Sequence, residues 1–221
     1  MKLTLLRHAE SVGNATGEYS LLQSDSLSEK GWEQAGHAAA ALQNGDFEKV
    51  IVSPLRRALE TLVPYLEKSG RVAEIWPEIA ETPPRRDCGE PAAEAWPTEK
   101  RTLPEGLKHR FVFRDSRGIK PAPGESVGQG LRRILDAEAC LQALAAEGCR
   151  SVLMVTHGHF MGELINRLLN IHEFIYFYHQ NCSMTQLLLR SPVRFQFGNL
   201  PIGIPKDRRE AEFIDLALGS A

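Results

Sequence analysis

Short apolar runs alternate with longer segments of helical period along most of the chain, and this alternation limits the folds that the chain can adopt. The apolar runs predict buried strands at 2–6, 49–53, 72–76, 151–156 and 185–189. Helices are predicted at 28–42, 54–69, 125–147 and 158–168. Strands that alternate with helices typically form a parallel sheet covered on both faces. We therefore expect an α/β fold, a three-layer α/β/α sandwich with a mostly parallel central sheet.

The length of 221 residues suits a single core, and we expect one domain over 1–221. The stretch from about 82 to 124 breaks the alternation, because prolines, arginines and single aromatic residues are scattered there without a period. A long irregular insertion of this kind is usually a lid or a substrate loop. It is expected to elaborate one face of the domain.

The formal charge of −2 does not favour nucleic acid as a partner. No apolar stretch approaches the roughly 18 residues of a membrane span, and the N-terminal apolar run is too short for a signal peptide. Four cysteines without CxxC spacing are expected to be free thiols, as in a reducing cytoplasm, and they are Cys88, Cys140, Cys149 and Cys182.

Three predicted strands end in residues that carry chemistry. The first ends in Arg7-His8, the second in Ser53 with Arg57 one turn into the next helix, and the strand at 151–156 in His157. Ligands of α/β sheets bind at the carboxyl ends of the strands, so these side chains are expected to meet. Two guanidinium groups match the oxygens of a phosphate, and helix N-termini add N–H donors.

A phosphate site of this kind becomes catalytic if it holds a nucleophile and an acid. A neutral imidazole can attack phosphorus and form a covalent intermediate. A carboxylic acid must protonate the leaving oxygen and later activate water. The segment after the strand at 72–76 offers two carboxylates, Glu78 and Glu81.

At this point the sequence resembles a known family. The segment Arg7-His8-Ala9-Glu10-Ser11-x-x-Asn14 is similar to the signature of the histidine phosphatase superfamily, which has the phosphoglycerate mutase-like fold. Other blocks of that family follow in order from residue 2 to about 190, namely Ser53-Pro54-Leu55-x-Arg57, Pro123-Gly124-Glu125-Ser126, Thr156-His157-Gly158 and Asn181-Cys182-Ser183. All blocks in order are far more specific than the first alone.

The resemblance implies a role for each matching residue. His8 would be the nucleophile that becomes phosphohistidine, and Arg7 and Arg57 would clamp the phosphoryl oxygens. His157 would stabilise the charge of the transition state. Asn14 would add a polar contact to the transferring group.

Two further roles follow from the resemblance. The backbone N–H of Gly158 or His159 would donate to the phosphoryl group. Glu81 would be the acid, because Ile79-Ala80-Glu81 fits the family pattern, with Glu78 as the fallback. The family needs neither a metal nor a cofactor, and His157-x-His159 lacks the companions of a metal motif.

The resemblance favours a metal-independent phosphomonoesterase of the histidine acid phosphatase type, acting on a small phosphate ester or a phosphoprotein. A cofactor-dependent phosphoglycerate mutase and a non-catalytic phosphate-binding module on the same fold are the alternatives. The aromatic run from Phe174 to Tyr178 is expected to be core or the interface of a homodimer.

Overall fold

The computed structural model describes residues 1–19, 22–83, 108–114, 124–173 and 175–205. Its strands are β1 (Lys2–Arg7), β2 (Lys49–Val52), β3 (Ala73–Ile75), β4 (Phe111–Phe113), β5 (Ser151–Thr156), β6 (Ser183–Leu188) and β7 (Arg194–Pro201). Its α-helices are α1 (Val12–Thr16), α2 (Glu29–Leu42), α3 (Arg56–Ser69), α4 (Val127–Ala146) and α5 (Gly158–Leu168).

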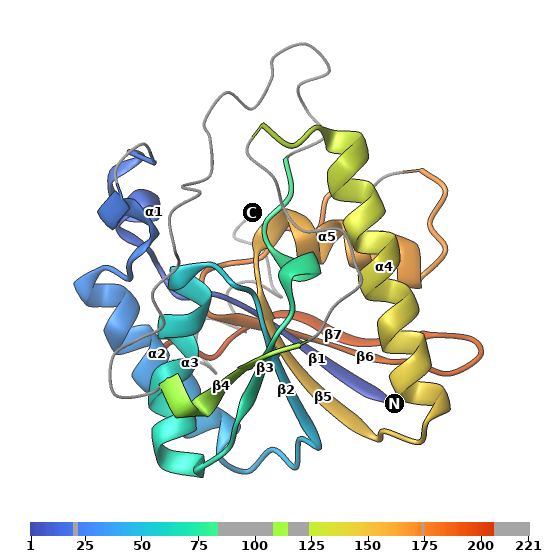
Figure 1. Ribbon diagram of the computed structural model, residues 1–221, viewed down its shortest axis with the longest axis horizontal. Coiled ribbons are helices and arrows are strands. Elements are labelled where there is room, and N and C mark those ends of the chain that lie inside the picture. The colour runs from blue at the N-terminus through green and yellow to red at the C-terminus, as the bar shows by residue number, and fades with distance from the viewer. Residues whose placement is uncertain (20–21, 84–107, 115–123, 174, 206–221) are drawn as a thin grey trace, which may run out of the picture.

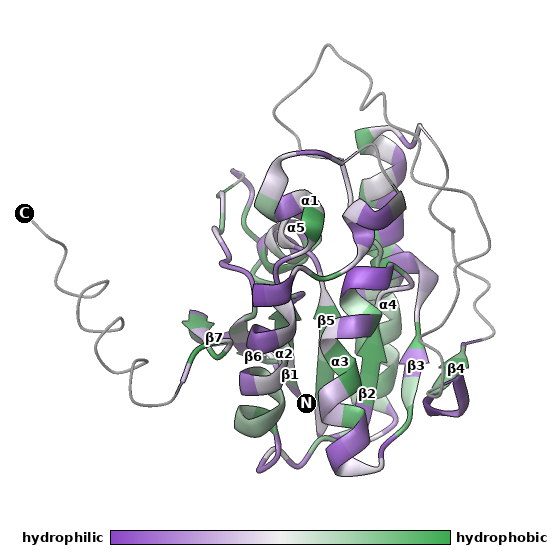
Figure 2. Cartoon of the chain, turned by 90° about the vertical axis from the view of Figure 1, so that its left-hand side faces the viewer, coloured by the Kyte–Doolittle hydropathy of each residue, from purple (hydrophilic) through white to green (hydrophobic). Residues whose placement is uncertain are grey.

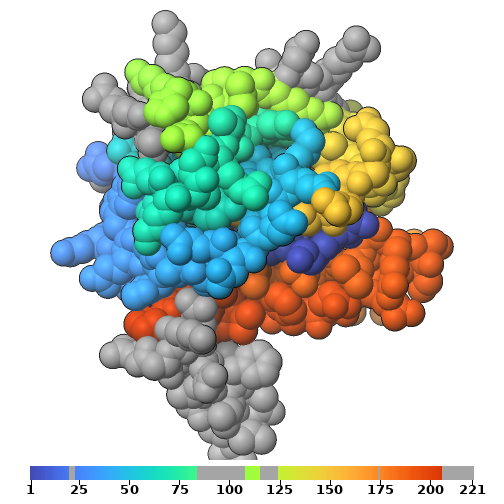
Figure 3. Space-filling model, turned by 90° about the horizontal axis from the view of Figure 1, so that it is seen from below, coloured from blue at the N-terminus to red at the C-terminus, as the bar shows by residue number. Residues whose placement is uncertain are grey.

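The strands form one sheet in the order β4-β3-β2-β5-β1-β6-β7 (Figure 1). The first five in this order are parallel to one another, whereas β6 runs antiparallel to β1 and β7 runs antiparallel to β6. Seen from below, β6 and β7 form one side of the molecule (Figure 3). The register places Arg7 opposite Thr156 and Val52 opposite Val155, so β1, β5 and β2 end at the same level.

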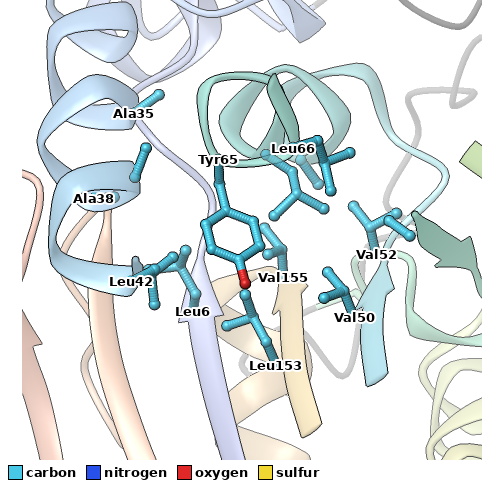
Figure 4. Close-up of a cluster of buried hydrophobic side chains, with 14 of the residues drawn as sticks. Leu6, Ala35, Ala38, Leu42, Val50, Val52, Tyr65, Leu66, Leu153 and Val155 are labelled. Carbon is cyan, nitrogen blue, oxygen red and sulfur yellow. The ribbon is translucent and has the colours of Figure 1, made fainter. Parts of the chain in front are cut away.

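Helices cover both faces of the sheet, as the three-layer prediction requires. Alternate residues of β1 point to opposite faces, so that Leu6 packs beneath α2 and α3 while Leu3 and Leu5 pack against α4 and α5. Figure 4 shows the first of these cores, where Tyr65 of α3 lies over β5. The strands at the centre of the molecule are hydrophobic (Figure 2). The α/β class and its layering are therefore confirmed.

Several local predictions were wrong or incomplete. Helix α3 begins at Arg56 and not at residue 54, because Ser53 does not cap it. The predicted helix at 28–42 is observed as Glu29–Leu42, with Ser28 as its N-cap. The tail segment β7 and the short strand β4 were not predicted, since neither segment has a clear apolar period.

Part of the predicted insertion belongs to the sheet. Residues 108–114 include β4, which pairs in parallel with β3, while 84–107 and 115–123 lie outside the described residues. The single-domain assignment and the role of the insertion stay predictions. Cys140 and Cys149 are free thiols, Cys182 is buried, and Cys88 lies outside the described residues. None of the described helices is both long and apolar enough to cross a membrane.

Candidate active site

His8 directly follows β1, and its side chain is only 2% exposed. Its Nδ1 atom lies 2.7 Å from the carbonyl oxygen of Ala9. A carbonyl can only accept, so Nδ1 carries the proton and Nε2 carries the lone pair. Burial first, and then the charges of Arg57 and Arg7, hold the pKa of His8 well below its usual range. The imidazole is therefore neutral, with Nε2 available as a nucleophile.

Arg57 lies in the first turn of α3 and faces that nitrogen. Its Nε–H donates to His8 Nε2 at 3.2 Å. Thr61, one turn later, donates to the Arg57 carbonyl at 2.6 Å and accepts the Ala9 N–H at 2.9 Å. The hydroxyl of Thr61 thus ties the start of α3 to the residue that fixes the His8 ring.

Arg57 also forms an ion pair that sequence reasoning missed. Its Nη1 is paired with Asp25, whose other oxygen accepts the Arg56 N–H at 2.8 Å. Asp25 therefore holds the guanidinium and the N-terminus of α3 together. Asp25 and Arg57 are 32 positions apart, so no local pattern signals this contact.

His157 follows β5 and is fully buried, with its ring centroid 5.0 Å from that of His8. Its Nε2 lies 2.7 Å from Ser53 Oγ, which also accepts the Leu55 N–H at 3.3 Å. Ser53 therefore orients this ring. The Nδ1 atom of His157 is buried without a hydrogen-bond partner. Burial first, and then Arg57, keep the pKa of His157 well below its usual range, so the ring is neutral.

Arg7 ends β1 beside these rings. Its Nη1 donates to the carbonyl of His179, and its Nε is buried without a hydrogen-bond partner. A side chain at Gly158 would lie 3.5 Å from that Nε, so Gly158 leaves the space over the guanidinium open. Two unpartnered polar atoms, Arg7 Nε and His157 Nδ1, thus occur in one buried site. Such atoms need a polar ligand.

The two candidate acids have different surroundings. Glu81 accepts the Phe160 N–H at 2.9 Å, at the start of α5, and its side chain is 13% exposed. It also interacts electrostatically with Arg7 and Arg57. Glu78 is 1% exposed and is paired with Arg114 at 3.2 Å. These surroundings favour Glu81 over Glu78.

Asn14 caps α1 reciprocally with Ser11, whose N–H donates to Asn14 Oδ1 at 3.2 Å. Asn181 donates to the same oxygen and to the His8 carbonyl, each at 3.1 Å. Because β6 is antiparallel to β1, the start of β6 lies at the carboxyl end of β1, and this brings Asn181 to the site. The contact of Asn14 with a substrate stays a prediction.

Among the described residues, no three His, Cys, Asp or Glu side chains are grouped closely enough to hold a metal ion. The positive charge of the site comes from two guanidinium groups. The two buried rings between them are neutral. This arrangement fits a phosphate group, because arginines bind its oxygens and a neutral imidazole can attack its phosphorus.

Comparisons with known proteins agree with this geometry. Residues 3–194 match the profile of the histidine phosphatase superfamily (branch 1). An adenosylcobalamin/alpha-ribazole phosphatase of Salmonella typhi is 31% identical over 180 residues, which cover 76% of this chain and 80% of that protein. A Yersinia enterocolitica protein named "Probable phosphoglycerate mutase" is 25% identical over 190 residues, covering 85% of this chain and 84% of that protein.

A solved structure shows the same fold. The alpha-ribazole phosphatase of Shigella flexneri superposes with a TM-score of 0.65 at 20% identity, over 90% of this chain and 96% of that one. The profile match covers most of the chain, and the Salmonella relative aligns over most of both sequences. The chain therefore belongs to the histidine phosphatase superfamily and is a hydrolase with the phosphatase activity of that family.

Proposed function

We propose that the protein hydrolyses a phosphate monoester in two steps through a phosphohistidine on His8. The observation that carries this proposal is the fixed tautomer of His8, since the 2.7 Å contact of Nδ1 with Ala9 leaves the lone pair on Nε2. In the first step Nε2 attacks phosphorus and the ester oxygen leaves. In the second step water attacks phosphorus and Nε2 leaves, which restores the enzyme.

The other groups stabilise the transferring phosphoryl group. Arg57 Nε–H, which now donates to His8 Nε2, turns to a phosphoryl oxygen, and Arg7 Nε–H donates to another. His157 donates from Nδ1 while the Ser53 hydroxyl donates to its Nε2. The Gly158 N–H, in the first turn of α5, completes the set. Positioning and charge account for most of the catalysis of such a transfer.

Glu81 is proposed as the acid that protonates the leaving oxygen and then as the base that activates water. Its electrostatic contact with both arginines supports this assignment, and the ion pair of Glu78 with Arg114 makes Glu78 the weaker choice. No step needs a metal ion or a cofactor.

The test is hydrolysis of an aryl phosphate in excess EDTA by the wild type and by His8→Ala, with His172→Ala as the control. His172 is an exposed histidine outside the site. We expect His8→Ala to lose about 10⁴-fold or more in kcat, and only the wild type and the control to form an alkali-stable, acid-labile phosphoenzyme from labelled substrate. Equal turnover by His8→Ala would refute the nucleophile assignment. Binding of phosphate without turnover of any ester would point to a non-catalytic module.

Phosphoglycerate mutase activity beside hydrolysis is the second candidate, because the Yersinia relative with that name aligns with 85% of this chain. The same phosphohistidine would then return its phosphoryl group to the product and not to water. Interconversion of phosphoglycerates that depends on 2,3-bisphosphoglycerate, faster than release of inorganic phosphate, would establish the mutase.

The substrate is proposed to be a small-molecule phosphate ester in the cytoplasm, or else a phosphoprotein. The Salmonella relative makes an alpha-ribazole phosphate the first ester to screen. A homodimer is also proposed, since Ile175, Tyr176 and Tyr178 of the aromatic run are 51%, 53% and 60% exposed. Sedimentation of the wild type and of a Tyr176→Ser/Tyr178→Ser variant tests that interface.

A further inference from the structure

The carboxylate of Glu81 is surrounded by N–H donors. Its Oε1 accepts the Phe160 N–H at 2.9 Å and the Thr82 N–H at 3.0 Å. Its Oε2 accepts the His159 N–H at 3.5 Å and lies 3.7 Å from His159 Nδ1. Four donors suit an ionised carboxylate. The residue that must deliver a proton is thus held in its charged form, and the proton needs another source.

The hydrogen bonds of Glu81 also indicate which oxygen can take a proton. Oε1 already accepts two N–H groups at ordinary distances, whereas the backbone bond to Oε2 is long. A proton therefore adds more readily to Oε2, the oxygen that faces the His159 ring. The His159 side chain is 42% exposed, so the ring has room to approach Oε2 and has access to solvent protons.

Charged and titratable groups from every neighbouring element act on this pair. They are Arg7 of β1, Arg57 of α3, Glu163 one turn further along α5, and His179 before β6, while Arg133 of α4 donates to the backbone carbonyl of Glu81. Burial alone would raise the pKa of Glu81, but the contacts with His159, the Phe160 N–H and Arg57 outweigh it and lower the pKa. The nearby carboxylate of Glu81 raises the pKa of His159, against the effect of burial. These opposite shifts place a proton shared by the pair mainly on the imidazole.

We propose that His159 stores the proton that Glu81 delivers to the leaving oxygen. In the first step the proton passes from His159 Nδ1 to Glu81 Oε2 and from there to the leaving oxygen, while His8 Nε2 bonds to phosphorus and the ester P–O bond breaks. In the second step water bonds to phosphorus and the P–N bond breaks. Glu81 takes the proton of the water and passes it back to His159.

His159 touches no reacting atom in this scheme and acts only through Glu81. The inference rests on the proposed phosphohistidine route, and it adds the group that sets the alkaline limit of activity. An isolated carboxylic acid with a lowered pKa would lose its proton in the acid range. Because His159 holds the proton in its place, the Glu81–His159 pair stays protonated, and able to deliver that proton, to higher pH.

The experiment compares kcat/KM against pH for the wild type, His159→Asn and the exposed-histidine control His172→Ala, on an alkyl phosphate and on nitrophenyl phosphate. We expect His159→Asn to move the alkaline limb for the alkyl ester by at least one pH unit towards acid. The rate on that ester at pH 7.5 should fall about tenfold or more. Nitrophenolate leaves without a proton, so the aryl ester should lose less than threefold.

A second variant separates proton storage from a structural role. His159→Ala opens an exposed site, and added imidazole should restore activity on the alkyl ester with a saturating dose dependence. An unmoved alkaline limb in His159→Asn, or equal losses on both esters, would overturn the proposal, as would His159→Ala that imidazole does not rescue. The proposed function fails separately, if the wild type forms no phosphoenzyme.

Discussion

The two halves of the candidate site are supported in different ways. On the phosphate side, His8 and His157 directly follow strands, and Arg57 lies in the first turn of α3. Hydrogen bonds of Thr61 join Arg57 to Ala9, and Ser53 contacts His157. On the acid side, Glu81 lies after β3 in the described stretch 76–83, whose one regular element is the short turn Pro77–Ile79. Regular structure positions one half directly, whereas remote contacts must position the other.

Three of those remote contacts come from one arginine. Arg133 of α4 is fully buried and donates to the carbonyls of Glu78, Ala80 and Glu81 at 2.7, 2.9 and 2.8 Å. Its charge is balanced by Glu125, which accepts from Arg133 Nε at 2.6 Å. The backbone that carries the acid is therefore fixed by an ion pair from another helix.

The largest effect is expected on the phosphate side, from Arg57→Ala. Loss of a charge that binds the transferring group should lower kcat/KM about 10³-fold, and equally for alkyl and aryl esters, because both pass through the same phosphoryl group. Arg56→Ala is the matched control, since the Arg56 side chain is 51% exposed and its guanidinium pairs with Glu60 and not with a residue of the site. Steady-state kinetics of the two variants measure the difference, and similar losses in both would contradict the assignment.

Glu81→Gln should have a large effect that depends on the leaving group. Loss of a general acid is expected to cost about 10²- to 10⁴-fold in kcat/KM for an alkyl ester, and far less for nitrophenyl phosphate. The parallel variant is Glu78→Gln, for which we expect no such dependence. If Glu78→Gln gives the leaving-group dependence, the fallback acid is correct and Glu81 only caps α5.

Arg133→Met should lower stability and release the backbone that positions Glu81. Removal of one partner of a buried ion pair costs about 3–5 kcal/mol, so we expect the free energy of unfolding in urea to fall by that amount. Turnover of the alkyl ester should fall, while the affinity for vanadate changes little because the phosphate side is intact. A double variant, Arg133→Met/Glu125→Leu, should recover stability and not turnover. Recovery of both would mean that the pair does not position Glu81.

The smallest effects are expected in the pH dependence of stability. The buried histidines and His159 contribute to it with opposite signs. Burial lowers the pKa of His8 and His157 strongly and that of His179 to about 4. The folded protein keeps these rings neutral, while the unfolded chain binds protons below about pH 6.5. Stability is therefore expected to fall as the pH drops below that value, by up to about 1.4 kcal/mol per pH unit for each ring.

His159 should behave in the opposite way. Its pKa is raised by Glu81, so its contribution is complete below the unfolded pKa and is lost as the pH rises through the folded pKa. We expect His159→Asn to destabilise the protein more at pH 5.5 than at pH 8, as measured by urea unfolding. A destabilisation that does not vary with pH would exclude the ion pair with Glu81.

The same contrast explains what could be predicted from the sequence. The strands that precede His8 and His157 are strongly apolar, so the sequence predicts both strands and the meeting of these residues at their carboxyl ends. The Ser53-Pro54 pair is locally typical of a helix start, but the Ser53 hydroxyl lies at hydrogen-bond distance from His157, which is 104 residues away. Arg133 lies 52 residues from Glu81, and a local pattern carries no signal of such a contact.

The place of β1 in the sheet has a consequence for synthesis. Both neighbours of β1 are later strands, β5 and β6, which span residues 151–188. The strand that leads into the nucleophile is thus synthesised before both of its neighbours, and pairing across such a separation is slow. A nascent chain shorter than this has Arg7 and His8 but no pocket around them. Translation itself therefore delays reactivity at His8 until most of the polypeptide has been made.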